Sequence, residues 1–92
     1  MIKPFKHKGL QAFFESGSKK GIQAKHANKL RLQLAAIDTA HSIDDLDILG
    51  HGLHPLKGKR KSLWSITVKG NWRITFEYER GDAHIVNYED YH

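Results

Sequence analysis

Apolar residues in the first half of the chain recur at the spacing of an amphipathic helix. Between residues 24 and 37 they fall every three or four positions, at Ala27, Leu30, Leu34 and Ile37, which predicts a helix with one buried face. We expect the other face to leave Lys25, Lys29 and Gln33 to solvent. A shorter helix is predicted over residues 8–15, followed by a linker at residues 17–21 and by a third helical turn that begins at Ser42.

The second half alternates apolar and polar residues, which is the period of a β-strand. Residues 64–68 and 72–78 predict two antiparallel strands joined by a loop at residues 69–71. Directly opposed residues share a face of the sheet. The loop therefore sets apolar residues opposite one another, in the pairs Val68–Trp72, Ile66–Ile74 and Trp64–Phe76. A second hairpin, with residues 80–81 as its loop, pairs Tyr78 with Ala83, Phe76 with Ile85 and Arg73 with Tyr88.

These elements predict a single α+β domain over residues 1–92, with two or three N-terminal helices packed on one face of a small antiparallel sheet. The opposite, open face is expected to carry Ser65, Thr67, Arg73 and Thr75. If the last strand continues to the end of the chain, Tyr88, Asp90 and His92 join that face. Residues 2–6 suit a short edge strand, because proline is tolerated at a sheet edge.

Composition narrows the classes of function. Fifteen Lys and Arg against ten Asp and Glu give a net charge of +5, which favours polyanionic partners, although solubility alone would also account for it. No cysteine is present, so a disulfide, a thiolate nucleophile and a cysteine zinc site are excluded. Lysines interrupt the apolar residues of the first ten positions, and no stretch approaches the roughly 20 apolar residues of a membrane span. We therefore expect a soluble, cytoplasmic protein with no membrane partner.

Residues 53–61, LHPLKGKRK, gather four cations within five positions, at Lys57, Lys59, Arg60 and Lys61. Such a run either binds phosphates or forms a solvated loop. Aromatic residues in the adjacent strands favour the first interpretation, because basic groups interleaved with aromatic rings suit single-stranded nucleic acid. Arg73, on the polar face, either pairs with Glu77 or Asp90 or binds a phosphate through its planar guanidinium.

Three residues are candidates for proton transfer, namely His54, Asp90 and His92. Histidine titrates near neutral pH, and a nearby carboxylate orients it. Tyr91 has the opposite strand parity, so it is either an aromatic at the core edge or is brought beside them by a twist. We assign no role to His7, His26 and His41. No metal site is expected, because the histidines at positions 51 and 54 lack further convergent ligands.

Four blocks of the sequence occur in a specific order. They are MIKPFKHKGLQAFFESG at residues 1–17, LHPLKG at 53–58, LWSITVKGNWRITFEY at 63–78 and GDAHIVNYEDYH at 81–92. Together they resemble the HigB toxins, in the RelE-like superfamily of bacterial toxin-antitoxin systems. The resemblance spans the chain and departs from the family pattern at Ser62 and Lys69, which belong to turns or strand edges.

The resemblance implies an endoribonuclease that cleaves messenger RNA in the decoding (A) site of the ribosome, without a metal or cofactor. It implies a HigA-like helix-turn-helix antitoxin, with operator DNA bound only through the antitoxin complex. By position, catalysis falls to His54, Asp90 and His92, substrate positioning to Tyr91, and phosphate contact to Lys57 and Arg73. Asp90 or His92 would be the base and His54 the acid or charge stabiliser. Two alternatives stay open: a non-enzymatic toxin that poisons DNA gyrase, and a non-catalytic basic RNA-binding module.

Overall fold

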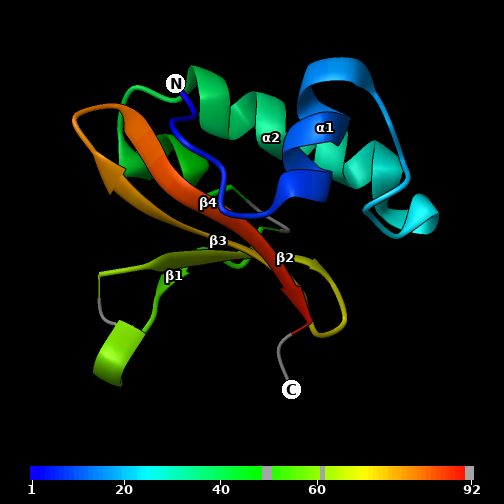
Figure 1. The fold of residues 1–92 in the computed structure, drawn as a ribbon. Helices are drawn as coiled ribbons and strands as arrows, with labels where there is room; N and C mark the ends of the chain where they lie inside the picture. The colour runs from blue at the N-terminus through cyan, green and yellow to red at the C-terminus, as the bar shows by residue number, and fades with distance from the viewer. Residues whose placement is uncertain (49–50, 61, 91–92) are drawn as a thin grey trace.

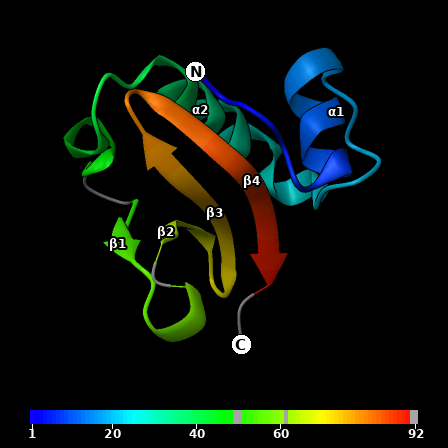
Figure 2. The same ribbon diagram turned by 60° about the vertical axis from the view of Figure 1, so that its left-hand side comes forward.

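The chain folds into helices on one side of an antiparallel sheet (Figures 1 and 2), as a computed structural model of residues 1–48, 51–60 and 62–90 shows. In chain order the elements are α1 (Lys8–Ser16), the 3-10 turn η1 (Ala24–His26), α2 (Ala27–Thr39), the turn η2 (Ile43–Leu46), β1 (His54–Pro55), the turn η3 (Gly58–Arg60), β2 (Trp64–Lys69), β3 (Trp72–Glu79) and β4 (Asp82–Asp90). The strands lie in the order β1-β2-β3-β4, each antiparallel to its neighbour. The predicted α+β architecture is confirmed.

Local signals in the sequence set the helix ends. The Leu10 amide donates to Nδ1 of His7, 2.9 Å away, and so caps the start of α1. The helix ends at Gly17, whose φ of 80° lets its amide turn back to the Phe13 carbonyl. Ser42 and Asp45 form a reciprocal capping box at η2. The predicted helices, the linker and the third helical turn therefore all exist.

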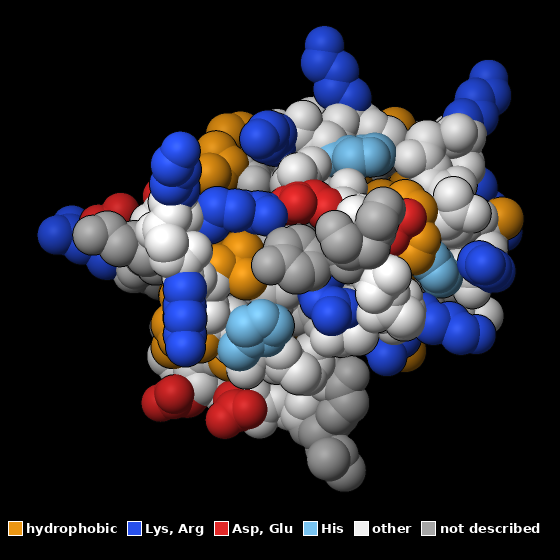
Figure 3. Space-filling view, turned by 90° about the horizontal axis from the view of Figure 1, so that it is seen from below, with side chains coloured by type: hydrophobic (Ala, Val, Ile, Leu, Met, Phe, Trp, Pro, Cys, Tyr) orange, Lys and Arg blue, Asp and Glu red, His pale blue; other side chains and the backbone are white. Residues whose placement is uncertain are grey.

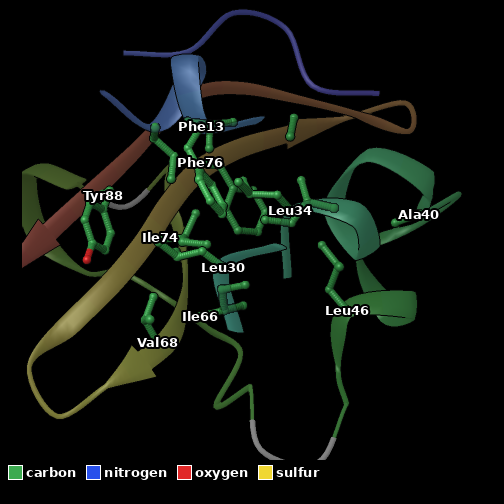
Figure 4. Close-up of a cluster of buried hydrophobic side chains, with 14 of the residues drawn as sticks. Phe13, Leu30, Leu34, Ala40, Leu46, Ile66, Val68, Ile74, Phe76 and Tyr88 are labelled. Carbon is green, nitrogen blue, oxygen red and sulfur yellow. The ribbon is translucent and has the colours of Figure 1, made fainter. Parts of the chain in front are cut away.

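The core lies between α2 and the sheet. Leu30, Leu34 and Ile37 are each at most 1% exposed, and Figure 4 shows the first two beside Ile74 and Phe76 of β3. The predicted apolar face of this helix is confirmed.

The prediction that Gln33 faces solvent is wrong. Gln33 is 1% exposed, and its Nε2 donates to the Thr67 carbonyl of β2 at 2.7 Å. The helix buries this polar residue because a backbone acceptor of the sheet lies within its reach.

The first hairpin keeps most of the predicted register. Trp64 lies opposite Phe76 and Ile66 opposite Ile74, as expected. The register then shifts between Thr67 and Lys69, so that Trp72 lies opposite Lys69. The predicted Val68–Trp72 pair and three-residue loop are wrong, because a bulge takes up one residue before the turn. This shift lies beside the turn, so the buried pairs of the hairpin are unaffected.

The second hairpin departs further from the prediction. Tyr78 lies opposite Ala83 as expected, but the register shifts between Thr75 and Glu77. The pairs Phe76–Ile85 and Arg73–Tyr88 are wrong; the observed pairs place Ile74 opposite Tyr88 and Arg73 opposite Glu89. A bulge in β4 inverts the parity of every later residue.

The inverted parity changes which side chains reach the open face. Tyr88, only 4% exposed, belongs to the helix-covered face, where Figure 4 shows it at the edge of the core cluster. Asp90 shares its parity and lies opposite Trp72, so its predicted place on the open face is also wrong. Glu89 takes that place instead. His92, predicted to join the same face, lies outside the described residues.

The first residues of the chain run beside β4 (Figure 1). Ile2 and Phe5 form parallel bridges with Ala83 and Val86, and the Lys6 amide donates to the Val86 carbonyl at 2.8 Å. The predicted edge pairing of residues 2–6 is confirmed, as isolated bridges. No helix in the described ranges combines the length and apolar character needed to cross a membrane.

Candidate functional site

The open face is the side of the sheet away from the helices. Strand register assigns to it His54, Ser65, Thr67, Arg73, Thr75, Asn87 and Glu89. Figure 3 views the molecule from this side and shows Lys and Arg side chains spread over it, with histidines and several acidic side chains between them. The basic character expected from composition is thus present around this face, where it would attract a polyanion.

His54 stands on β1 with its side chain exposed. Its Nδ1–H donates to the Gly52 carbonyl at 3.0 Å, which leaves Nε2 as the acceptor of the neutral ring. Gly52 has a φ of 59°, and its loop is tied to the sheet because the Thr67 amide donates to the His51 carbonyl at 2.6 Å. The loop therefore fixes one nitrogen of the His54 ring and leaves the other exposed.

A hollow of about 270 Å³ adjoins this histidine and is lined by His54, Pro55, Leu56, Lys57 and Arg60. The structure thus brings together one predicted proton-transfer residue and two predicted phosphate-binding residues. Lys57 is exposed, as is the next lysine, Lys59. A phosphodiester in this hollow would meet cationic groups and an imidazole at once, which is the combination that in-line phosphate chemistry requires.

Glu89 forms a polar cluster on the open face that the sequence did not predict. Its carboxylate pairs with the Arg60 guanidinium and accepts a hydrogen bond from the Thr75 hydroxyl at 2.6 Å. Burial alone would raise the pKa of Glu89, but hydrogen bonds from Thr75, Arg60 and Asn87, with the charge of Arg60, hold its pKa below the ordinary value. Glu89 therefore stays ionised and holds Arg60 against the sheet.

Arg73 extends along the turn of the first hairpin. Its Nη1 donates to the Gly70 carbonyl at 2.8 Å and more weakly to the Trp72 carbonyl at 3.4 Å. These backbone hydrogen bonds hold the guanidinium at the turn, and the choice between an ion pair and phosphate binding stays a prediction. Across the strands, the backbone of Arg73 lies opposite that of Glu89.

A second cluster supports the end of β4 from the helix-covered side. The Tyr88 hydroxyl lies 2.6 Å from Nδ1 of His26, which is 3% exposed. The Trp72 ring stacks on Tyr88 at 4.5 Å between centroids, and His7 meets Tyr88 edge-on at 5.5 Å. The sequence alone indicates no role for His7 or His26. Spacing along the chain held no signal for them, because the contacts join segments more than 60 residues apart.

Burial sets the protonation states in this second cluster. It lowers the pKa of His26, and the charges of Lys25 and Lys69 lower that pKa further. Burial also raises the pKa of Tyr88. Near neutral pH the pair is therefore an uncharged imidazole beside an uncharged phenol, as a buried contact requires.

The remaining predicted site residues are placed only in part. Asp90 is exposed at the end of β4, on the parity of Tyr88. Tyr91, His92 and Lys61 lie outside the described residues. Within the part of the chain that the structure describes, no three His, Asp or Glu side chains converge as metal ligands would.

A small α+β fold with a basic open face and a histidine beside clustered cations is the arrangement expected of RelE-like toxins. A family model described as "RelE-like toxin of type II toxin-antitoxin system HigB" matches residues 3–92. "Endoribonuclease HigB" of Proteus vulgaris is 54% identical over 92 residues, covering 100% of both chains. The chain belongs to this HigB-like family of RelE-like toxins, and membership implies an antitoxin partner.

Proposed function

We propose that this toxin is an endoribonuclease that cleaves messenger RNA in the decoding site of the ribosome and so stops translation. The observation that carries the proposal is the 54% identity, over the whole chain, to a relative named an endoribonuclease. The hollow lined by His54, Lys57 and Arg60 also supports the proposal, because RNA cleavage needs a proton-transfer group next to cations that stabilise the phosphate charge.

The proposed reaction uses the ribose of the substrate as the nucleophile. Asp90 or His92 takes the proton of the 2′-hydroxyl, which attacks the neighbouring phosphorus as the bond to the 5′-oxygen breaks. His54 protonates that departing oxygen or stabilises the charge on the phosphorane, and the products carry a 2′,3′-cyclic phosphate and a 5′-hydroxyl. These steps need no metal ion, and DNA, which lacks the 2′-hydroxyl, is inert as a substrate.

Cationic side chains serve the phosphate in this proposal. Lys57 and Arg73 contact the scissile phosphate, while Lys59, Arg60 and Lys61 hold the flanking backbone. Tyr91 stacks on or positions a base. The exposure of Lys57 and Lys59 on the segment around η3 agrees with such contacts.

The ribosome supplies the substrate geometry. A site with so few catalytic groups gains most from an RNA already bent for in-line attack, since orientation alone accelerates a reaction by many orders of magnitude. We therefore propose that free RNA is cut poorly. A HigA-like helix-turn-helix antitoxin silences the toxin, and the complex of the two binds operator DNA through the antitoxin.

The test adds the purified protein to ribosomes stalled on a defined message, maps the RNA ends and assays them for cyclic phosphate. Wild-type protein is expected to cut in the decoding site. His54→Ala and His92→Ala are each expected to lose about 10²- to 10⁴-fold in rate with little loss of binding, whereas the variant His41→Ala, which changes an exposed histidine that the proposed reaction does not use, remains active.

Other outcomes would replace this proposal. Intact message together with broken DNA in arrested cells would indicate a gyrase poison. Salt-dependent RNA binding without product would indicate a binding module.

A further inference from the structure

A second hollow lies on the open face, beside the cluster at Glu89. It measures about 300 Å³, at the small end of the range for ligand sites. Its walls come from the N-terminal segment, from the chain before β2, and from β3 and β4. The reaction described above uses neither this hollow nor its wall residues Leu63, Ile85 and Asn87.

The apolar wall of this hollow contains a strained residue. Ile85 has a φ of 47°, a conformation that a β-branched side chain adopts only at a cost. Its side chain is 39% exposed although it sits within the sheet, and it faces the hollow together with Leu63. The bulge in β4 thus presents an apolar surface to solvent, on which the face of an aromatic ring system would pack.

Hydrogen-bond acceptors line the opposite side. Glu89 is ionised and only accepts, and the Asn87 side chain already donates to it. That donation leaves the Asn87 amide oxygen as a second acceptor. Two acceptors suit a ligand edge that carries an amino group, and uracil is the one common RNA base without an exocyclic amine.

Two cations complete the rim. Lys6 is exposed, and Arg60, held by its ion pair with Glu89, also borders the hollow that contains His54. Arg60 therefore stands between the two hollows. A phosphate beside it would link a nucleotide in this hollow to the reacting phosphodiester next door.

We propose that this hollow is a subsite for one unpaired RNA nucleotide, whose base packs on Ile85 and Leu63 and whose amino group is accepted by Asn87 and Glu89. This inference rests on the proposed function for its substrate class and adds a base preference to it. Adenine, cytosine and guanine bind better than uracil, and Lys6 and Arg60 take the phosphate.

The test titrates ¹⁵N-labelled protein with each of the four ribonucleoside 5′-monophosphates and follows the backbone amides of Ile85 and Asn87. The uridine nucleotide is expected to bind about two- to tenfold more weakly than the other three, the effect of losing one hydrogen bond. Asn87→Ala is expected to reduce the difference in affinity between the uridine nucleotide and the other three.

One variant tests whether the apolar wall contributes to nucleotide binding without destabilising the fold. Ile85→Gly removes the side chain and relieves the positive φ, so it is expected to melt at or above the wild-type temperature while all four nucleotides bind at least about threefold more weakly. Leu32→Ala, which removes a 72% exposed leucine from α2, serves as the matched control and is expected to bind normally.

Two results would overturn the subsite. If inorganic phosphate alone reproduced the same shifts with the same affinity as the nucleotides, the hollow would be an anion site. Equal binding of all nucleotides by wild-type protein and by Ile85→Gly would contradict the base contacts. The titration measures binding and needs no cleavage. Absence of nucleotide binding would therefore contradict the subsite but not the ribonuclease proposal, and absence of cleavage would not affect the binding measurement.

Discussion

The two faces of the sheet are ordered by different forces. On the helix-covered face Ile66, Ile74 and Phe76 are fully buried under α2, and their order comes from apolar packing. On the open face Ser65 and Thr75 are almost as completely buried, at 1% and 2% exposed, yet α1 and α2 lie on the other side of the sheet (Figure 1). The cover at Thr75 is the carboxylate of Glu89 and the cation it holds. One face is therefore sensitive to side-chain volume and the other to charge.

The largest expected effect is on the helix-covered face. Phe76→Ala leaves a cavity at the centre of the core and is expected to lower the free energy of unfolding by about 3–5 kcal/mol. Phe76→Leu keeps most of the side-chain volume and is expected to lower the free energy of unfolding clearly less than Phe76→Ala does. Urea unfolding followed by tryptophan fluorescence measures both. A loss under about 1 kcal/mol for the alanine variant would contradict the assignment of the core.

The next effect belongs to the open face and depends on charge. Glu89→Gln keeps the shape but removes the ion pair, and is expected to lower the free energy of unfolding at pH 7 by about 1–3 kcal/mol. Because the folded pKa of Glu89 is lowered, its contribution is full above the ordinary value of about 4.5 and is lost as the pH falls through the folded pKa.

Wild type and Glu89→Gln should therefore differ at pH 7 and converge in acid. Urea unfolding at a series of pH values tests this, and Glu15→Gln, an exposed acidic residue on α1, is the control. A difference that persists unchanged in acid, where Glu89 is protonated in the folded protein, would show that the effect is not one of charge.

A smaller effect is expected from His26 behind β4. Its folded pKa lies below the ordinary value of about 6.5, so the unfolded chain takes up protons first and the free energy of unfolding falls as the pH drops below about 6.5. The lowered pKa of His7 acts in the same direction. His26→Asn does not titrate, so its stability is expected to fall less between pH 7 and pH 5. If the free energy of unfolding fell equally with pH in wild type and in His26→Asn, a group other than His26 would cause the pH dependence.

The smallest effect concerns Ser65. Its hydroxyl is buried and has no hydrogen-bond partner among the described residues. Ser65→Ala is expected to leave the free energy of unfolding unchanged or to raise it by up to about 1 kcal/mol, because it removes a buried polar group without breaking a bond. Thermal melting compares it with Thr75→Ala, which does break one and is expected to be the less stable variant. The reverse order would contradict the account of this face.

Hydrophobic periodicity was sufficient to predict the two helices, the long strands and the core pairs Trp64–Phe76 and Ile66–Ile74 of the first hairpin, but not its turn, where Trp72 lies opposite Lys69. It failed after Thr75, where the register shifts. A bulge at Ile85, with its positive φ, is not visible in a binary pattern because isoleucine is a strong strand former. That single extra residue exchanged Tyr88 and Glu89 between the two faces.

The part of the candidate site formed by residues close together in the sequence was predictable, and the part formed by residues far apart in the sequence was not. His54, Lys57 and Arg60 lie within seven positions, and the structure places them around one hollow. The ion pair of Arg60 with Glu89 joins residues 29 apart, and the contact of His26 with Tyr88 joins residues 62 apart. Both depend on the strand register, which the bulge had changed.

The most direct test of the central claim, that the toxin promotes attack by a ribose 2′-hydroxyl, changes the substrate. Ribosomes are loaded with a message that carries a single 2′-deoxynucleotide immediately 5′ to the scissile phosphate, or with the all-ribose message. The wild-type toxin is expected to cut the all-ribose message, leaving a 2′,3′-cyclic phosphate, and to leave the deoxy-substituted position intact. Equal cleavage of both messages at that position would contradict the mechanism.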